Sequence, residues 1–152
     1  MNKMREETKV RVMVIGGGGR EHAIVKALKS NPTVEKIYCL PGNGGIAMDA
    51  ECVSIGPKDI AGQVDFATSH GIDYAVVAPD DPLALGAVDA LTSAGIPCFG
   101  PDKKAAIIES SKAFAKDLMK KYNIPTAAYE IFTDFQAAKE YLKTSPIPVV
   151  IK

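Results

Sequence analysis

The stretch KVRVMVIGGGGREH, residues 9–22, decides the fold of this chain of 152 residues. Residues 10–15 are apolar and mostly β-branched apart from one arginine, and four glycines end the run abruptly, which is typical of a buried parallel strand. A helix is expected to begin near Arg20 and to end at Asn31 and Pro32. Its apolar positions recur at helical spacing: Ala23, Ile24, Ala27 and Leu28. The stretch therefore predicts a strand, a glycine turn and a helix.

The glycines at 16–19 suit an anion, because a residue without Cβ lets backbone N–H groups approach a ligand closely. The helix start behind them adds unpaired N–H donors and the positive end of its dipole. A phosphate is therefore the expected occupant. The alternative is a tight turn that binds nothing, but four successive glycines give up conformational entropy that a plain turn does not require.

A dinucleotide site is not expected at this turn. The fingerprint G-x-G-x-x-G needs a third glycine where this chain has Glu21 or His22. It also needs an acidic residue at the end of the next strand, but the strand expected at residues 37–40 ends in Pro41 and Gly42. We therefore predict no nicotinamide or flavin cofactor.

The composition suits a soluble globular domain. Hydrophobic residues make up 47% of the chain and 18 acidic residues balance 18 basic ones, so the chain can bury a core without a disulfide or a metal. A neutral balance without a basic stripe argues against nucleic acid or an anionic membrane as a partner. Residues 1–8 are charged and lack an apolar signal region, and no apolar run approaches transmembrane length, so we expect a cytoplasmic protein.

No metal site is expected from the cysteines and histidines. Cys39, Cys52 and Cys98 are widely spaced in apolar, strand-like segments, which favours buried free thiols over a disulfide or a metal site. His22 and His70 are each isolated from any second candidate ligand in the sequence.

Strand and helix signals keep alternating as far as residue 101. After residue 40, strands are expected at 51–55, at 74–78 and within 95–101. Helices are expected at 58–70 and at a segment that carries Leu85, Val88 and Leu91 and ends at about residue 94. Five strands with helical crossovers predict an α/β fold, a doubly wound parallel sheet with right-handed connections.

Two further loops follow strands at the carboxyl edge of this sheet, which carries the ligand in open α/β folds. Residues 41–47, PGNGGIA, follow the second strand, and the alternative interpretation is a Pro-Gly turn followed by an Asn-Gly turn. Residues 79–83, PDDPL, follow the fourth strand. An acid there can accept hydrogen bonds from an amine or from sugar hydroxyls, or cap the next helix. We assign Asp81 to capping and leave Asp80 as a candidate substrate contact.

The organisation changes after residue 101. The expected elements are a helical turn at 105–108, a helix from 110 to 123, a strand at 129–132, a helix around 137–142 and a strand at 148–152. Two strands and a helix cannot cover their own apolar faces. We therefore expect the sequence to be the front part of a longer protein, with one domain at residues 1–101 and the start of a second at residues 102–152.

Seven motifs occur along the chain in order. They are VMVIGGGGREH at 12–22, PGNGG at 41–45, PDDPL at 79–83, FGP at 99–101, SKAFAK at 111–116, IPTA at 124–127 and VVIK at 149–152. Through them the entire chain resembles the N-terminal portion of the phosphoribosylamine–glycine ligases, also called glycinamide ribonucleotide synthetases. The resemblance implies a Rossmann-like pre-ATP-grasp domain, followed by the truncated beginning of an ATP-grasp α+β domain.

The resemblance also implies an activity. In this family, ATP phosphorylates the carboxylate of glycine, and the amine of phosphoribosylamine attacks the glycyl phosphate to give glycinamide ribonucleotide for purine synthesis. The implied cofactors are ATP and Mg²⁺ or Mn²⁺ in the longer protein, whereas for this chain alone we expect no bound cofactor, no ligation and a monomer. The alternatives are another ATP-grasp carboxylate–amine ligase and a non-catalytic sugar-phosphate-binding module.

Carried over residue by residue, the resemblance implies two sets of contacts. Phosphoribosylamine would contact Gly17, Gly18, Gly19, Arg20, Glu21, Asn43, Gly44, Pro79, Asp80, Pro82 and Leu83. ATP would contact Lys112 and Lys152, which otherwise read as solvent-facing charges. No catalytic or metal-binding residue is assigned. The chain departs from the family at Asp80, where glutamate is usual, and at Ser110, where glycine is usual, and the shorter Asp80 leaves room for an altered substrate.

Overall fold

The computed structural model describes residues 9–151, so the expectations for residues 1–8 and for Lys152 lie outside the described residues. The chain divides into two compact parts, which we call unit 1, up to Ser111, and unit 2, from Lys112. The assignment of two domains with a boundary after residue 101 stays a prediction. In the described part of the chain, no helix has both the length and the apolar character needed to cross a bilayer.

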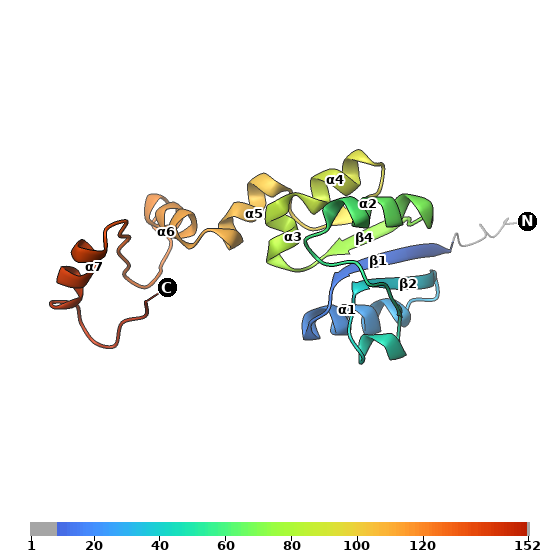
Figure 1. Cartoon of the computed structure of the whole chain (residues 1–152), viewed down its shortest axis with the longest axis horizontal. Helices are drawn as coiled ribbons and strands as arrows, with labels where there is room; N and C mark the ends of the chain where they lie inside the picture. Colours follow the sequence, from blue (N-terminus) through green and yellow to red (C-terminus); the bar gives the residue numbers. More distant parts are fainter. Residues whose placement is uncertain (1–8, 152) are drawn as a thin grey trace, which may run out of the picture. The chain divides into compact units, whose positions relative to one another are not determined.

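Unit 1 is built on one parallel sheet with the strand order β3-β2-β1-β4-β5 (Figure 1). Its strands are β1 (Val10–Gly16), β2 (Val34–Pro41), β3 (Glu51–Cys52), β4 (Tyr74–Val77) and β5 (Cys98–Phe99). The chain runs from β1 outward to β3 on one side and then returns to β4 and β5 on the other side. This order confirms the predicted doubly wound sheet, and it places the topological switch point between β1 and β4.

Helices cover both faces of the sheet (Figure 1). They are α1 (Gly19–Lys29), the 3-10 helix η1 (Ile46–Met48), α2 (Ile60–Ser69), α3 (Asp80–Leu85), α4 (Ala87–Ser93) and α5 (Lys103–Ser110). On one face, α1 and η1 share a core with Val12 and Val14, and on the other face α2, α3 and α4 share a core with Met13 and Ile15. Because β1 is buried on both faces, its sequence is one continuous apolar run.

The face that α1 buries differs from the predicted one. Val25 is fully buried and Ile24 and Leu28 are partly buried, but Ala23 and Ala27 are exposed. A helix turns its larger apolar side chains toward the sheet, because the stabilisation grows with the apolar area that is buried. The two alanines share the helical spacing of the apolar positions, but they do not belong to the buried face.

Two elements of unit 1 are shorter than predicted. The helix expected to run to about residue 94 is divided into α3 and α4 at Gly86, whose φ of +93° does not continue a helix. The strand expected at 51–55 ends at Cys52, because the chain turns at Val53, where the Ile55 N–H donates to the Val53 carbonyl at 2.7 Å.

The opposite holds for α5, which is longer than the single turn predicted at 105–108. Asp102 caps it, since its Oδ1 accepts a hydrogen bond from the Ala105 N–H at 2.8 Å. The Lys103 N–H donates to Asp89 Oδ2 at 2.8 Å, which ties the start of α5 to α4. These two bonds anchor α5 within unit 1.

Unit 2 contains α6 (Lys112–Lys121) and α7 (Phe135–Leu142). Lys116 holds the segment after α6 against that helix, since its Nζ donates to Thr126 Oγ1 at 2.7 Å and to the Ala127 carbonyl at 2.9 Å. The Tyr129 hydroxyl adds a bond of 2.8 Å to Asp117 Oδ1. Side-chain bonds therefore order this segment.

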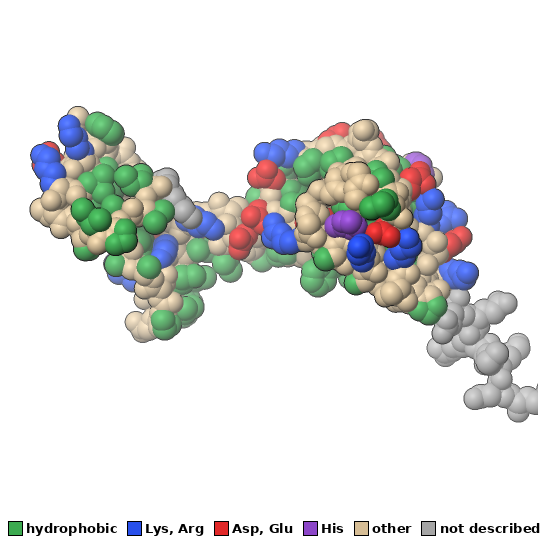
Figure 2. Space-filling view, turned by 90° about the horizontal axis from the view of Figure 1, so that it is seen from below, with side chains coloured by type: hydrophobic (Ala, Val, Ile, Leu, Met, Phe, Trp, Pro, Cys, Tyr) green, Lys and Arg blue, Asp and Glu red, His purple; other side chains and the backbone are tan. Residues whose placement is uncertain are grey.

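The strands predicted at 129–132 and 148–152 are wrong for the described residues, since neither 129–132 nor 148–151 forms a strand. A strand needs a neighbour to pair its backbone groups, and the described part of unit 2 supplies none. Unit 2 also leaves apolar side chains uncovered (Figure 2), among them Phe135, which is 75% exposed, and Ile147, which is 92% exposed.

The core of unit 1 yields a matched prediction on two leucines. Leu91 on α4 is fully buried, whereas Leu85 on α3 is 49% exposed. Leu91→Ala is expected to lower the free energy of unfolding by about 2–5 kcal/mol, because it opens a cavity in the core. Leu85→Ala should lower it by about 1 kcal/mol or less. Urea titrations of the 152-residue chain followed by circular dichroism measure both, and equal losses would contradict this core assignment.

Candidate functional site

Three loops come together at the carboxyl ends of β1, β2 and β4. The first loop, 16–19, begins at the end of β1, and the second, 41–45, begins at the end of β2. The third, 79–83, follows β4 and runs into the first turn of α3. The Gly42 N–H donates to the Gly16 carbonyl at 3.1 Å, which joins the first two. A Cβ placed on Gly16 would lie 2.8 Å from Pro79 Cγ, so the third loop lies against the first. The predicted loops therefore share the edge beside the switch point, where open α/β sheets bind ligands.

The first loop needs glycine at two positions for packing alone. Gly16 has a φ of +123°, and a Cβ on Gly17 would lie 2.5 Å from the Gly42 carbonyl oxygen, which is backbone and cannot swing away. A Cβ on Gly19, in contrast, would have nothing within 4 Å. The close approach of the loops thus explains Gly16 and Gly17, and Gly19 borders open space.

Glu21 closes the first loop from within α1. It is only 4% exposed, and its Oε2 accepts a hydrogen bond from the Gly18 N–H at 2.5 Å. Gly18 is the N-cap and Glu21 the third helical residue, so this bond is the glutamate half of a capping box. The second oxygen, Oε1, is buried and has no hydrogen-bond partner among the described residues. Such an atom is costly to leave unpaired, so a hydrogen-bond donor that reaches Oε1 would stabilise it.

The anion-binding capacity of this helix start is smaller than the sequence suggested. The Gly18 N–H is taken by Glu21, and the His22 N–H donates to the Gly18 carbonyl at 3.1 Å. Gly19 and Arg20 hold the first two helical positions, whose N–H groups have no partner within a helix. Arg20 and Gly19 are exposed, so these donors are accessible to a phosphate.

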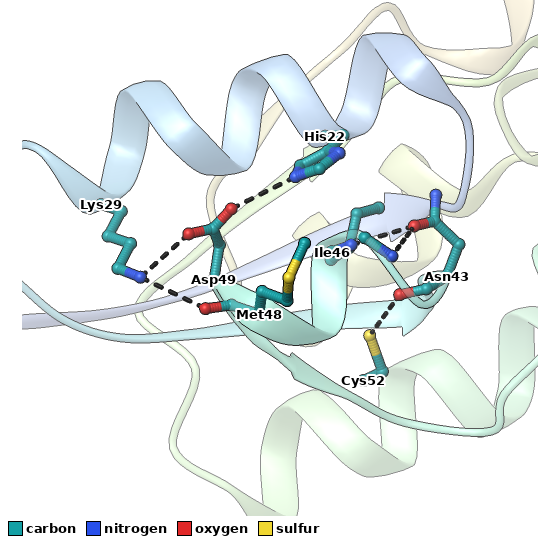
Figure 3. A network of polar contacts seen from close by, with 8 residues as sticks. His22, Lys29, Asn43, Ile46, Met48, Asp49 and Cys52 are labelled. Atoms are coloured by element: carbon teal, nitrogen blue, oxygen red, sulfur yellow. Dashed lines mark hydrogen bonds and ion pairs between the residues drawn. The ribbon is translucent and has the colours of Figure 1, made fainter.

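Asn43 builds the second loop, where its side-chain oxygen accepts a hydrogen bond from the Ile46 N–H (Figure 3), and it also fastens this loop to the first. Its Nδ2 donates to the Gly17 carbonyl at 2.7 Å, and its Oδ1 accepts from the N–H groups of Gly45 and Ile46 at 2.8 and 2.9 Å. This is an Asx turn, in which the side chain replaces a backbone acceptor. Gly44 is exposed, with open space where a Cβ would be. The side chain of Asn43 is therefore chiefly engaged in positioning the loops.

The third loop corrects the assignment of Asp81. The N-cap of α3 is Pro79, and Asp80 and Asp81 both lie in the first turn. Asp81 pairs with Lys58 at 2.7 Å between its Oδ2 and the lysine Nζ, so it does not cap the helix. Proline and two acidic residues suit a helix start, because the dipole favours negative charge there without a capping side chain.

The other predicted residues of this loop differ in exposure. Asp80 is exposed at the start of α3, whereas Pro82 and Leu83 are buried. Leu83 is 8% exposed and belongs to the core shared with Met13 and Ile15. Any contact of Pro82 or Leu83 with a ligand is therefore limited to a small part of each residue.

The predicted ATP contacts lie elsewhere. Lys112 is exposed and begins α6 in unit 2, and Lys152 lies outside the described residues. The structure therefore brings together the phosphoribosylamine residues predicted in unit 1, and it leaves the predicted ATP contacts as predictions.

Sequence reasoning missed a polar network around Asp49 (Figure 3). Asp49 Oδ2 lies 3.2 Å from His22 Nε2, and Oδ1 lies 2.9 Å from Lys29 Nζ. Two hydrogen bonds hold the pKa of the Asp49 carboxyl below its usual value: the one from Lys29 has the larger effect, and the one from His22 the next largest. His22 and Lys29 are seven residues apart on one helix face, which the sequence could have shown, but only the fold brings Asp49 between them.

The described cysteines are free thiols. One of them, Cys39, contacts the first loop. Its Sγ donates to the Gly16 carbonyl at 3.2 Å. Burial, followed by the charges of Cys52 and Glu21, raises the pKa of the Cys39 thiol to about 12. Cys39 therefore stays protonated and unreactive at neutral pH.

The raised pKa of Cys39 predicts an alkaline loss of stability. The unfolded thiol ionises from about pH 9, whereas the folded thiol keeps its proton up to about pH 12. The folded chain then binds more protons, so the free energy of unfolding falls as the pH rises between these values. Cys39→Ala should make this fall less steep than in the parent chain and in Cys52→Ala. Urea titrations from pH 8 to 11 measure the slope, and an unchanged slope in Cys39→Ala would exclude this thiol as a cause.

The first loop predicts a contrast between two glycine variants. Gly17→Ala drives a Cβ into the Gly42 carbonyl, and it should lower the free energy of unfolding by about 1–3 kcal/mol through overpacking. Gly19→Ala enters open space in the first turn of α1, and it should leave stability unchanged or raise it slightly. Thermal and urea unfolding of both variants measure these changes in the free energy of unfolding. Two equally tolerated alanines would contradict the close approach of the loops.

Comparison with known proteins agrees with the fold and with the predicted resemblance. Residues 10–109 match the family "Phosphoribosylglycinamide synthetase, N domain", and residues 110–152 match its "ATP-grasp (A) domain". The phosphoribosylamine–glycine ligase of Caldanaerobacter subterraneus subsp. tengcongensis is 50% identical over 143 residues, covering 94% of this chain and 34% of the relative. The phosphoribosylamine–glycine ligase of Listeria monocytogenes is 51% identical over 142 residues, covering 93% of this chain and 34% of the relative.

Solved structures show the same likeness. The phosphoribosylamine–glycine ligase of Thermotoga maritima superposes with a TM-score of 0.67 at 28% identity, covering 91% of this chain and 32% of that one. A bacterial biotin carboxylase domain shares the fold with a TM-score of 0.66 at 16% identity, covering 89% of this chain and 34% of that one. The chain spans about a third of the length of the curated relatives that it matches. With a family match over residues 10–109, the chain belongs to the phosphoribosylglycinamide synthetase family.

Proposed function

We propose that this chain supplies the phosphoribosylamine-binding edge of a phosphoribosylamine–glycine ligase. The observation that carries the proposal is the buried Oε1 of Glu21, which lacks a partner beside the accessible N–H groups of Gly19 and Arg20. Phosphoribosylamine offers an anionic phosphate together with amine and hydroxyl donors. A site with both N–H donors and a carboxylate acceptor matches that combination.

The predicted contacts then divide by role. The N–H groups of Gly19 and Arg20 and the Arg20 guanidinium bind the phosphate, while Glu21 and Asp80 accept hydrogen bonds from the amine or the ribose hydroxyls. The remaining residues shape the site through their packing or their backbone: Gly17, Gly18, Asn43, Gly44, Pro79, Pro82 and Leu83. This part of the ligase thus holds the attacking amine in place, which is the contribution of positioning to catalysis.

ATP, glycine and a divalent cation belong to the same proposal for the whole ligase. Within residues 9–151, no three His, Cys, Asp or Glu side chains lie close enough together to hold a metal ion. The described residues therefore do not fit a site for Mg²⁺ or Mn²⁺, and we derive no step through the metal. Lys112 and Lys152 remain the proposed ATP contacts, and a cytoplasmic monomer remains the proposed state of the protein.

A second candidate is another ATP-grasp carboxylate–amine ligase, which Asp80 favours. Its carboxylate is one methylene shorter than the usual glutamate and is exposed at the start of α3. In the ligase that carries this chain, Asp80→Glu should leave the preference for phosphoribosylamine over other amines unchanged if the first assignment holds. A preference for a different amine in the parent enzyme would favour the second candidate.

Calorimetric titration of the 152-residue chain with ribose 5-phosphate, a stable analogue of phosphoribosylamine, tests the proposed site. Saturable binding is expected, and Gly18→Val should weaken it at least tenfold, because a Cβ there lies 2.8 Å from Glu21 Oε2. Gly56→Val is the matched control, since a Cβ on Gly56 meets nothing within 4 Å and lies outside the three loops. Circular dichroism of both variants is the control that each of them folds. Absence of saturable binding by the parent chain would overturn the proposal.

A further inference from the structure

We infer that His22 contacts the sugar of the substrate through its Nδ1, an inference that rests on the proposed function. His22 lies in the first turn of α1 beside the loop at 41–45, and its side chain is 25% exposed. The contacts assigned above do not use it. Its orientation, its free nitrogen and its neighbours each support this role.

Asp49 holds the imidazole in one orientation (Figure 3). His22 Nε2 lies 3.2 Å from Asp49 Oδ2, and the carboxylate is itself held by Lys29 Nζ at 2.9 Å. The Asp49 N–H also donates to the Ile46 carbonyl at 2.8 Å, which anchors its backbone to η1. Because an ionised carboxylate only accepts hydrogen bonds, Nε2 carries the proton. When the ring is neutral, Nδ1 is then an acceptor.

The Nδ1 edge of His22 faces the second loop. A Cβ on Gly45 would lie 3.0 Å from His22 Cε1 and 3.3 Å from Nδ1, so glycine at this position leaves room at that edge. Within residues 9–151, no hydrogen bond to His22 Nδ1 is present. The nitrogen is thus an unused acceptor beside Gly45, one residue after Gly44 of the proposed site.

His22 also lies on the helix whose start carries the proposed phosphate donors. Gly19 and His22 are three residues apart, which places them on one face of α1. A sugar phosphate bound through the N–H groups of Gly19 and Arg20 would extend its ribose toward the loop at 41–45. A ribose hydroxyl is therefore the group that donates to Nδ1, whereas the phosphate oxygens, which only accept, are not.

Nitrogen NMR of the imidazoles tests the inference on the unmodified chain. The chain has two histidines, and His70 is an internal control, because it caps the end of α2, and the centroid of its ring lies 3.9 Å from that of Phe66, on which it is stacked. Ribose 5-phosphate should move the Nδ1 resonance of His22 and leave that of His70 in place. Inorganic sulfate, an anion that carries no O–H donor at neutral pH, should move neither Nδ1 resonance.

Variants give a second readout. His22→Asn should weaken ribose 5-phosphate binding by about two- to tenfold, the value of one neutral hydrogen bond, while His70→Asn should not change it. Asp49→Asn should cause a similar loss, and the two losses should not add in the double variant, because Asp49 acts by positioning His22. A purely structural pair would lower stability without moving Nδ1.

The outcomes separate this inference from the function on which it rests. Saturable binding of ribose 5-phosphate with an unmoved His22 Nδ1 would overturn the inference and leave the proposed function standing. An equal shift on adding inorganic sulfate would also overturn it, because the contact would then be with the anion. No binding by the parent chain would overturn both.

Discussion

The close approach of the backbones at Gly17 and Gly42 is the constraint on which the functional edge of unit 1 depends. Only the absence of a side chain at position 17 lets the loop after β1 lie against the loop after β2. Asn43 can then reach the Gly17 carbonyl at 2.7 Å while it also caps its own turn. The start of α1 and the start of η1 are thereby held at one edge of the sheet, together with the polar groups that each carries.

Glu21 changes the electrostatic character of that edge. A glycine turn before a helix is by itself a site for an anion, because its N–H groups and the helix dipole all present positive charge. Here a buried carboxylate occupies the Gly18 N–H and leaves one oxygen without a partner. The edge therefore combines N–H donors with a carboxylate acceptor, whereas a glycine turn alone offers only donors.

The sequence predicted best where one local pattern had one physical solution. The apolar run in β1 allows only a strand buried on both faces, and loops after parallel strands must meet at the carboxyl edge. Prediction failed where the outcome depended on a distant partner. Asp81 pairs with Lys58 instead of capping α3, Val25 rather than Ala23 faces the sheet, and residues 129–132 have no strand beside them.

Sequence by itself determined the doubly wound sheet, the family and the three loops of the candidate site, because periodicity, glycine clusters and motif order are properties of the chain alone. Only the tertiary structure decided what each polar atom does. Glu21 closes a turn, Asn43 joins two loops and Asp49 orients His22. A hydrogen bond depends on distances of a few tenths of an ångström between atoms far apart in the chain, and no spacing of residues encodes those distances.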